Sequence, residues 1–346
     1  MRLAVLASVG AFAALGATGY LVWDAGGGSP SDRAEARSRP PAAFLWAVNK
    51  NAEAEPFRAI PDKVALDMAK VRLGGRLFHD PRLSGDGTLA CASCHSLELG
   101  GADARSTPVG IGGAAIPLNS PTVLNAGFNI AQFWDGRAAS LEEQAAGPLL
   151  SPVEMGSNWP HAIQVITEDA TYRAAFAEYY GGVVEPATIL DAIATFERSL
   201  TTPGAPFDRY LKGDSTAISA RAKAGLKLFT AFGCSACHQG VNLGGNLFQK
   251  LGVVVPYFKD GEAVTQADLG RFNVTGREED RHVFKVPSLR NIALTGPYFH
   301  DGSVERLEDA ITLMAFHQLG RSVSDEEVAF IAEFLRTLDG APGGGQ

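Results

Sequence analysis

Two short stretches, Cys91-Ala-Ser-Cys-His95 and Cys234-Ser-Ala-Cys-His238, contain every cysteine of this 346-residue chain. The pattern Cys-x-x-Cys-His is the covalent attachment signature of a c-type haem. The two thiols add to the porphyrin vinyl groups, and the adjoining histidine binds the iron as its proximal ligand. A zinc site would need a second pair of ligands beside each pair, and neither a redox dithiol nor a structural disulfide needs the trailing histidine. The sequence therefore predicts two c-type haems, and the group at the sixth position of each iron becomes the main functional question.

Length and composition are those of a globular protein with about two domains, at roughly 150 residues each. The hydrophobic content of 46% is enough to form buried cores. The formal net charge of −8 at pH 7 argues against a nucleic-acid partner. The same acidic balance is compatible with docking of a basic redox protein.

The first 24 residues are predicted to be a signal peptide or an N-terminal membrane anchor. Residues 3–23 are uncharged and follow Arg2. A secretory signal has an apolar core of about 7–15 residues, whereas a membrane-spanning helix needs about 20, so the length favours an anchor. With Arg2 held inside, the rest of the chain faces outward, in the periplasm. Residues 25–43 are small, charged and proline-rich, and they are expected to form a flexible linker.

The sequence repeats coarsely around the two haem motifs. Leu73-Gly-Gly-Arg-Leu-Phe78 precedes the first motif, Leu226-Lys-Leu-Phe229 precedes the second, and Cys91 and Cys234 are 143 positions apart. This spacing predicts two haem domains in tandem, an N-terminal one over residues 44–204 and a C-terminal one over residues 205–340.

Helical periodicity of apolar residues is the main secondary-structure signal. It occurs in Pro61–Phe78, Leu141–Ala146, Thr171–Tyr180, Pro186–Leu200, Ala217–Phe232, Leu307–Phe316 and Ser324–Leu338. The last segment starts with Ser324 and has Glu327 three residues later, which is a capping box. Long loops with glycine and proline separate these segments, and none reads as a run of strands. The expected fold class is mainly α, with two tandem cytochrome c-like haem domains and long loops.

Further strings occur in a fixed order along the chain. They are Leu77-Phe-His-Asp-Pro-Arg-Leu-Ser84, Ser120-Pro-Thr-Val-Leu-Asn125, Gln132-Phe-Trp-Asp-Gly-Arg137, Pro152-Val-Glu-Met-Gly156 and Pro287-Ser-Leu-Arg-Asn-Ile-Ala-Leu-Thr-Gly-Pro-Tyr-Phe-His-Asp-Gly302. With these strings and the haem motifs, the chain from about residue 70 onward resembles the bacterial di-haem cytochrome c peroxidases. The resemblance implies two-electron reduction of hydrogen peroxide to water. It also implies electrons from a small cytochrome c or cupredoxin that enter at a high-potential C-terminal haem, with peroxide reacting at the N-terminal one. A homodimer is the habit of the family.

The C-terminal haem needs a second axial ligand. A His/Met pair raises the reduction potential relative to His/His, because thioether sulfur favours Fe(II). Met314 stands where the family places this ligand, 14 residues after His300. A core methionine on an amphipathic helix is the alternative role for Met314. His317, one turn further on, is the rival ligand and would give a bis-histidine haem.

The peroxidatic haem needs an acid/base group on its distal side. Cleavage of the O–O bond requires a proton to move from the near oxygen of peroxide to the far one. The resemblance implies Glu154 for this role and Gln144 as a hydrogen-bond donor to peroxide. On its own, Glu154 could equally be an ordinary surface acid. Trp134 matches the tryptophan that the family places between the two haems, a role that is compatible with a buried core position.

Further expectations concern a calcium site, a propionate contact and three loop charges. A candidate calcium site, in which side-chain and carbonyl oxygens would be the ligands, is implied by the resemblance at Asn119, Thr295 and Pro297. His300 is a candidate contact of a haem propionate. Residues expected to be loop charges without a role are Arg281, His282 and Lys285.

The chain departs from the family at one position of the distal loop. In many members a histidine 16 residues after the first motif histidine caps the peroxidatic iron until the other haem is reduced. Here that position is Ile111, and no histidine lies between His95 and His161. Because isoleucine has no lone pair for iron, we expect the N-terminal haem to be five-coordinate or water-ligated and active without reductive priming. The alternatives are a cap from His79 or His161, or loss of the activity.

Two other functions compete with the peroxidase. A di-haem oxidase of the methylamine-utilisation type modifies a tryptophan in a partner protein, and it carries a tyrosine where Met314 stands here. A pure electron carrier would not need Glu154, and it would keep both irons six-coordinate. Peroxide consumption with reduced cytochrome c as donor separates the three.

Overall fold

The computed structural model describes residues 56–259, 261 and 263–341. The predicted signal peptide or anchor (1–24) and the predicted linker (25–43) lie outside the described residues. Within the described ranges, no helix combines the length and the apolar character needed to cross a membrane.

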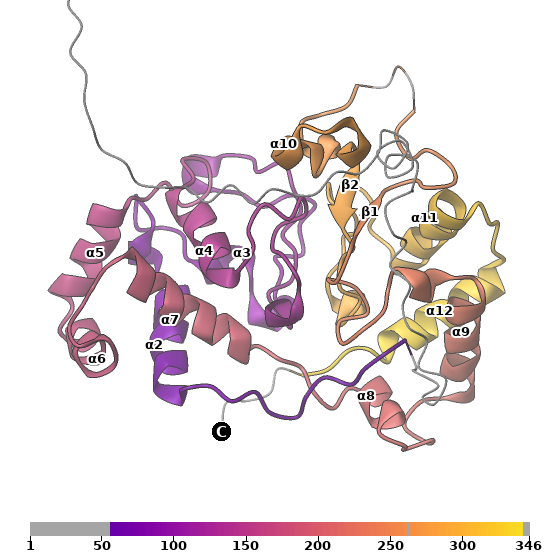
Figure 1. Cartoon of the computed structure of the whole chain (residues 1–346), viewed down its shortest axis with the longest axis horizontal. Helices are drawn as coiled ribbons and strands as arrows, with labels where there is room; N and C mark the ends of the chain where they lie inside the picture. Colours follow the sequence, from indigo (N-terminus) through magenta and orange to yellow (C-terminus); the bar gives the residue numbers. More distant parts are fainter. Residues whose placement is uncertain (1–55, 260, 262, 342–346) are drawn as a thin grey trace, which may run out of the picture. The chain divides into compact units, whose positions relative to one another are not determined.

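The described part of the chain is mainly helical, as the sequence predicts (Figure 1). Its α-helices are α2 (Met68–Phe78), α3 (Cys91–Cys94), α4 (Leu141–Leu150), α5 (Trp159–Glu168), α6 (Ala170–Tyr180), α7 (Pro186–Ser199), α8 (Pro206–Leu211), α9 (Ala220–Ala231), α10 (Phe272–Thr275), α11 (Leu307–Leu319) and α12 (Asp325–Arg336). Two three-residue strands, β1 (Phe248–Lys250) and β2 (Val283–Lys285), pair antiparallel with Phe248 opposite Lys285.

Side-chain caps explain where several helices begin. The helix predicted from Pro61 begins only at Met68, because Asp67 accepts hydrogen bonds from the backbone N–H groups of Ala69 and Lys70. The capping box predicted at Ser324 is confirmed at the start of α12. The sequence did not predict α5, α8 or the strand pair. The two strands are too short to show an alternating pattern.

Two apolar cores divide the described chain into halves. The N-terminal core is built mainly from α2, α5, α6 and α7, and its largest fully buried side chains include Phe78, Tyr172 and Phe176. The C-terminal core is built mainly from α8, α9, α11 and α12 around Phe207 and Phe334. Figure 1 shows the first group of helices in indigo to pink and the second in salmon to yellow. Two cytochrome c-like halves in tandem therefore agree with the expected fold class.

A glycine allows close helix contact in each half. A Cβ at Gly74 of α2 would lie 1.9 Å from the carbonyl oxygen of Ala192 in α7. A Cβ at Gly225 of α9 would lie 1.9 Å from the carbonyl oxygen of Phe330 in α12. Only glycine lets the two backbones approach so closely. Gly74 lies in the repeated segment before the first haem motif and Gly225 directly precedes the one before the second, so the repeat reflects one way of packing a helix pair.

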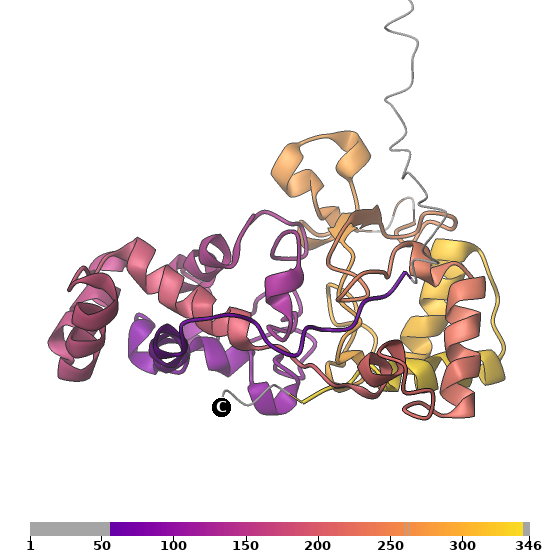
Figure 2. The same ribbon diagram turned by 60° about the horizontal axis from the view of Figure 1, so that its bottom comes forward.

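The segment before α2 links the halves. Phe57 belongs to the C-terminal core, where its ring lies 5.6 Å from that of Phe207. The backbone N–H of Ile60 donates to Asp208, whose carboxylate is 2.7 Å from the buried guanidinium of Arg290. Residues 56–67 then run from this core to α2 (Figure 2). Part of the predicted segment 44–204 thus packs with the C-terminal half.

Residues 121–148 and 287–314 are two copies of one structural unit, related by a constant shift of 166 positions. Each copy has a left-handed asparagine with φ of 61°, at Asn125 and Asn291. In each, a short 3-10 helix follows the asparagine and an isolated bridge follows the helix. The bridges pair Gln132 with Ala138 and Tyr298 with Val304. The copies end in α4 and α11. Trp134 and His300 therefore hold equivalent positions, as do Pro148 and Met314.

Candidate functional site

The histidines of the two haem motifs are held in the same way. The Nδ1 atom of His95 lies 3.3 Å from the carbonyl oxygen of Gly101, and that of His238 lies 3.1 Å from the carbonyl oxygen of Leu243. A hydrogen bond donated from Nδ1 fixes the tautomer and leaves Nε2 with its lone pair for a metal. Burial lowers the pKa of both imidazoles, that of His238 to about 4, so the rings stay neutral as metal ligands must be.

None of the four cysteines forms a disulfide, so all four remain available for haem attachment. Burial raises the pKa of the Cys91 thiol to about 12 and that of the Cys234 thiol to about 11. Each thiol pair lies beside its own neutral imidazole, and no cluster of three or more His, Cys, Asp or Glu side chains suited to a metal ion occurs among the described residues. This donor set fits two c-type haems and does not fit a zinc centre.

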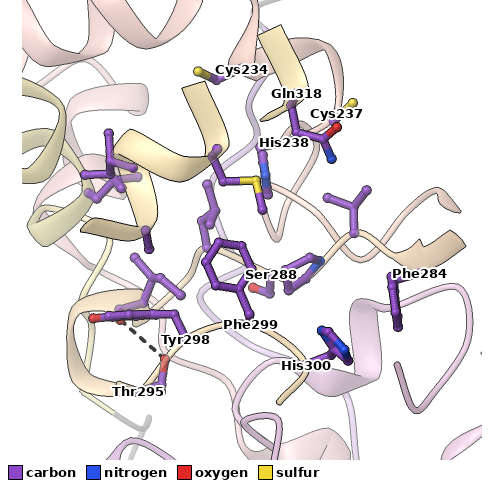
Figure 3. A pocket seen from close by; sticks show the side chains of 18 of the residues that line it. Cys234, Cys237, His238, Phe284, Ser288, Thr295, Tyr298, Phe299, His300 and Gln318 are labelled. Carbon is purple, nitrogen blue, oxygen red and sulfur yellow. Dashed lines mark hydrogen bonds between the residues drawn. The ribbon is translucent and has the colours of Figure 1, made fainter. Parts of the chain in front are cut away.

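An apolar cavity of about 250 Å³ opens beside the second haem motif. Its lining includes Cys234, Cys237 and His238 (Figure 3). Met314 lines the same cavity. His317 is not part of this lining, and its Nδ1 lies 3.1 Å from the carbonyl oxygen of Val255. The structure thus brings Met314, and not the rival His317, into the cavity with the proximal histidine.

Trp134 lies where the two halves meet. Its Nε1–H donates to the carbonyl oxygen of Asn119 over 2.9 Å, and its own carbonyl oxygen accepts from the N–H of Lys285 over 2.8 Å. Trp134 also lines the C-terminal cavity. The N–H of Asn119 donates in turn to the carbonyl oxygen of His300 over 2.8 Å. The indole N–H and the carbonyl oxygen of Trp134 therefore tie this residue to both halves.

The three residues of the candidate calcium site line the same cavity. They are Asn119, Thr295 and Pro297. The amide nitrogen of Asn119 donates to the carbonyl oxygens of Arg105 and Ser106, so its oxygen is the end left for a cation. The hydroxyl of Thr295 lies 3.4 Å from the carbonyl oxygen of Ile292. The set contains no carboxylate, the ligand that most strengthens calcium binding.

Glu154 lies in the turn that follows α4, close to the first haem motif. Burial raises the pKa of its carboxyl, and the nearby Arg137 opposes the rise. Its charge in turn contributes to the raised pKa of the Cys94 thiol, after burial and Asp103. Neither Glu154 nor Gln144, which is on α4, has a side-chain hydrogen bond within the described chain. Two polar side chains without a protein hydrogen-bond partner are thus available, and Glu154 is the one whose charge reaches Cys94.

The loop that carries Ile111 is fixed to the Glu154 turn. The N–H of Ile111 donates to the carbonyl oxygen of Glu154 over 2.8 Å, and an added Cβ at Gly156 would lie 2.9 Å from Cδ1 of Ile111. Gly110 packs as closely, since a Cβ there would lie 1.8 Å from the carbonyl oxygen of Val153. The isoleucine therefore acts as an apolar contact between two loops.

Both alternative capping histidines have a ring nitrogen within hydrogen-bond distance of a main-chain carbonyl oxygen. The ring of His79 is exposed, and its Nδ1 lies 2.7 Å from the carbonyl oxygen of Gly75 in its own helix. The Nε2 atom of His161 lies 2.9 Å from the carbonyl oxygen of Arg82. The chain has seven histidines, all among the described residues, and the other five include the two motif histidines and three in the C-terminal half.

The internal repeat shows why the two haem sites differ. Met314 of α11 corresponds to Pro148 of α4, so the N-terminal half has no sulfur at the position of this candidate axial ligand. The carbonyl oxygen of Pro148 accepts from the N–H of Met155, next to Glu154. The same helix position thus bears the candidate ligand Met314 in one half and supports the turn that carries Glu154 in the other. Aligning 121–148 with 287–314 would have revealed this from the sequence.

Sequence reasoning missed two buried ionisable groups. Lys285 was expected to be a loop charge, and this prediction is wrong, because the residue ends strand β2, is 7% exposed and lines the C-terminal cavity. Glu197 of α7 is 4% exposed, and burial raises the pKa of its carboxyl to about 8. Nothing in the local sequence marks either one, because their burial comes from contacts far along the chain.

Comparison with known proteins shows which family has this arrangement of motifs. Residues 68–216 match the family model described as di-haem cytochrome c peroxidase. The cytochrome c551 peroxidase of Nitrosomonas europaea is 46% identical over 291 residues, which cover 84% of this chain and 85% of that protein. The chain belongs to the di-haem cytochrome c peroxidase family. The main functional prediction is therefore confirmed at the level of the family, which carries two c-type haems.

Two further relatives help to separate the peroxidase from the oxidase. The cytochrome c peroxidase Ccp of Escherichia coli is 48% identical over 287 residues, which are 83% of this chain but only 61% of that protein. A crystal structure of a MauG-like protein associated with microbial copper homeostasis is 31% identical, with a TM-score of 0.71 over 86% of this chain and 96% of that one. The MauG-like protein is thus the more distant in sequence, which favours the peroxidase over the tryptophan-modifying oxidase.

Proposed function

We propose that this protein reduces hydrogen peroxide to water with electrons from a small cytochrome c or cupredoxin, and that it does so without reductive activation. The observation that carries the second part is Ile111, which packs on Gly156 and donates its N–H to Glu154. A loop held in this way offers iron no ligand in the oxidised protein. It also holds the Glu154 turn in place whichever redox state the other haem is in.

Glu154 would move the proton that the reaction requires. Reduction of one peroxide to two waters consumes two electrons and two protons. The N-terminal haem, when bound, supplies the iron at which peroxide is reduced. The Glu154 carboxylate accepts the proton of the near oxygen and returns it to the far oxygen as water leaves. Partial burial raises the pKa of this carboxyl towards the working pH, which suits a group that must both accept and donate. Gln144 would orient peroxide with an N–H donor.

Electron entry is proposed at the C-terminal haem, with His238 and Met314 as axial ligands. The support is that both side chains line one cavity and that His317 does not. A thioether ligand raises the potential, so this haem takes electrons readily from a donor. Trp134 is hydrogen-bonded to residues of both halves and is proposed to lie between the haems.

Four further assignments belong to the same proposal. A calcium ion at Asn119, Thr295 and Pro297 is supported by the free amide oxygen of Asn119. A periplasmic location, by signal cleavage or by an anchor at residues 3–23, is supported by the sequence of that segment. A homodimer rests on the habit of the family. The acidic net charge of −8 supports a basic donor protein.

The test is peroxide reduction by the fully oxidised holoprotein, started with reduced donor and no earlier incubation with reductant. We expect full activity from the first turnovers. Glu154→Gln should lower kcat by about 10²- to 10⁴-fold, the range for loss of a general acid/base. Glu98→Gln, which removes an exposed carboxylate near the same motif, should change little. A lag that prior reduction abolishes would contradict the open site, and normal turnover by Glu154→Gln would contradict its role.

A further inference from the structure

Lys285 is buried at the wall of the C-terminal cavity. It ends strand β2, opposite Phe248 of β1, and only 7% of its surface is exposed. Its N–H donates to the carbonyl oxygen of Trp134 over 2.8 Å, so it lies at the contact between the two halves. It is among the residues that line the same cavity as Cys234 and His238.

The amine of Lys285 has no ion pair and no hydrogen bond within the described chain. Burial alone lowers its pKa, to about 8, and no carboxylate acts on it. An ammonium group taken out of water without a partner is strongly disfavoured. Lysine is almost never buried unless it is paired, so the structure points to an anion that is not part of the protein.

A second group without a partner lies in the lining of the same cavity. His300 is 2% exposed, its Nε2 lies 2.7 Å from Oδ1 of Asp268, and its Nδ1 is buried without a partner. The other oxygen of Asp268 accepts from the hydroxyl of Thr265 over 2.7 Å, so this carboxylate is already engaged. Figure 3 shows His300 across the cavity from Cys234 and Cys237. The cavity therefore has a thioether-forming end and a polar end.

We propose that Lys285 is the counter-charge for a propionate of the haem attached at Cys234 and Cys237, and that it tunes the potential of that haem as a positioning residue. A haem carries its two carboxylates on the edge remote from its vinyl groups. In a haem bound here the cysteines would fix the vinyl groups, so the carboxylates would lie towards the end of the cavity where His300 lies. Among the described residues that line the cavity, Lys285 is the buried cation without a partner there. The proposal rests on haem attachment and not on peroxide turnover.

Charge gives the direction of the effect. A cation beside a propionate cancels negative charge near the iron, and this favours the reduced state. Without the ammonium, the carboxylate charge is left uncompensated in a site of low dielectric, and this stabilises the oxidised haem relative to the reduced one. Loss of Lys285 should therefore lower the midpoint potential of the C-terminal haem.

The experiment is a spectroelectrochemical titration of the holoprotein without peroxide. Lys285→Met should lower the equilibrium constant for reduction of the C-terminal haem about tenfold, which is ~59 mV for one electron. Lys285→Gln serves as a second neutral variant if methionine disturbs folding, and Lys285→Arg should keep the wild-type potential. The matched control is Lys250→Met, which removes an exposed lysine from the paired strand β1.

Two results would overturn the proposal. One is a wild-type potential in both neutral variants. The other is an equal shift in Lys250→Met, which would show a general effect of net charge. Since no peroxide is present, these results leave the proposed function standing, whereas an inactive wild type with a Lys285-dependent potential would contradict the proposed function alone.

Discussion

Replacing Glu197 with glutamine should change how stability depends on pH. The carboxyl is buried in α7, its Oε2 has no hydrogen-bond partner, and burial raises its pKa to about 8. Arg198 opposes this rise but is itself paired with Glu142 over 2.7 Å. Because the folded pKa lies above the ordinary value of 4.5, the folded protein keeps a proton that the unfolded chain has lost. Stability is therefore fully present below pH 4.5 and falls as the pH rises towards 8.

The size of the effect follows from the two pKa values. A difference of one proton bound corresponds to about 1.4 kcal/mol per pH unit. Between pH 6 and pH 8 the wild type should lose about 2 kcal/mol of unfolding free energy relative to Glu197→Gln, since the carboxyl begins to ionise near the upper limit. Urea unfolding of the holoprotein at both pH values measures this. The control is Glu185→Gln, which removes an exposed carboxylate next to the start of the same helix. Its unfolding free energy should change with pH as that of the wild type does. The same change in unfolding free energy with pH in Glu197→Gln and in the wild type would refute the reasoning.

Two other substitutions test the axial positions. Met314→Ala should abolish the thioether-to-iron absorption band and lower the potential of the C-terminal haem, whereas Met68→Ala, at a methionine that is 38% exposed, should do neither; an unchanged spectrum would reject Met314 as ligand. Pro148→Met should place a thioether at the N-terminal position that corresponds to Met314, giving a six-coordinate iron with at least tenfold less peroxide turnover. Pro148→Ala, which removes the proline without offering sulfur, should keep an open iron, and the same loss of turnover in both variants would point to helix geometry and not to ligation.

The covalent and helical features of this protein could be predicted because their signals are local. The haem motifs are five consecutive residues, and the capping box at Ser324 depends on Glu327 three positions later. Helix α7 was anticipated to within one residue at each end, since its apolar periodicity is long. By contrast, the helix predicted from Pro61 began seven residues too early, because Asp67 caps the chain only there.

The remaining features depend on contacts that the local sequence does not display. Lys285 is flanked by residues that read as a loop, and its burial comes from a strand partner 37 positions away in the register Phe248 to Lys285. Glu197 looks like any helical glutamate until the packing around α7 removes it from water. The equivalence of Pro148 and Met314 was visible in the sequence, but it becomes meaningful only when the left-handed asparagines and bridges show that the two copies fold alike.

The central claim is that the N-terminal haem is open in the oxidised enzyme because Ile111 stands where a capping histidine could be. The most direct measurement is the EPR spectrum of the fully oxidised holoprotein, with Ile111→His as the matched variant. The account predicts a high-spin ferric signal from the N-terminal haem of the wild type and its conversion to a low-spin signal in Ile111→His. A wild-type spectrum with low-spin signals alone would contradict it.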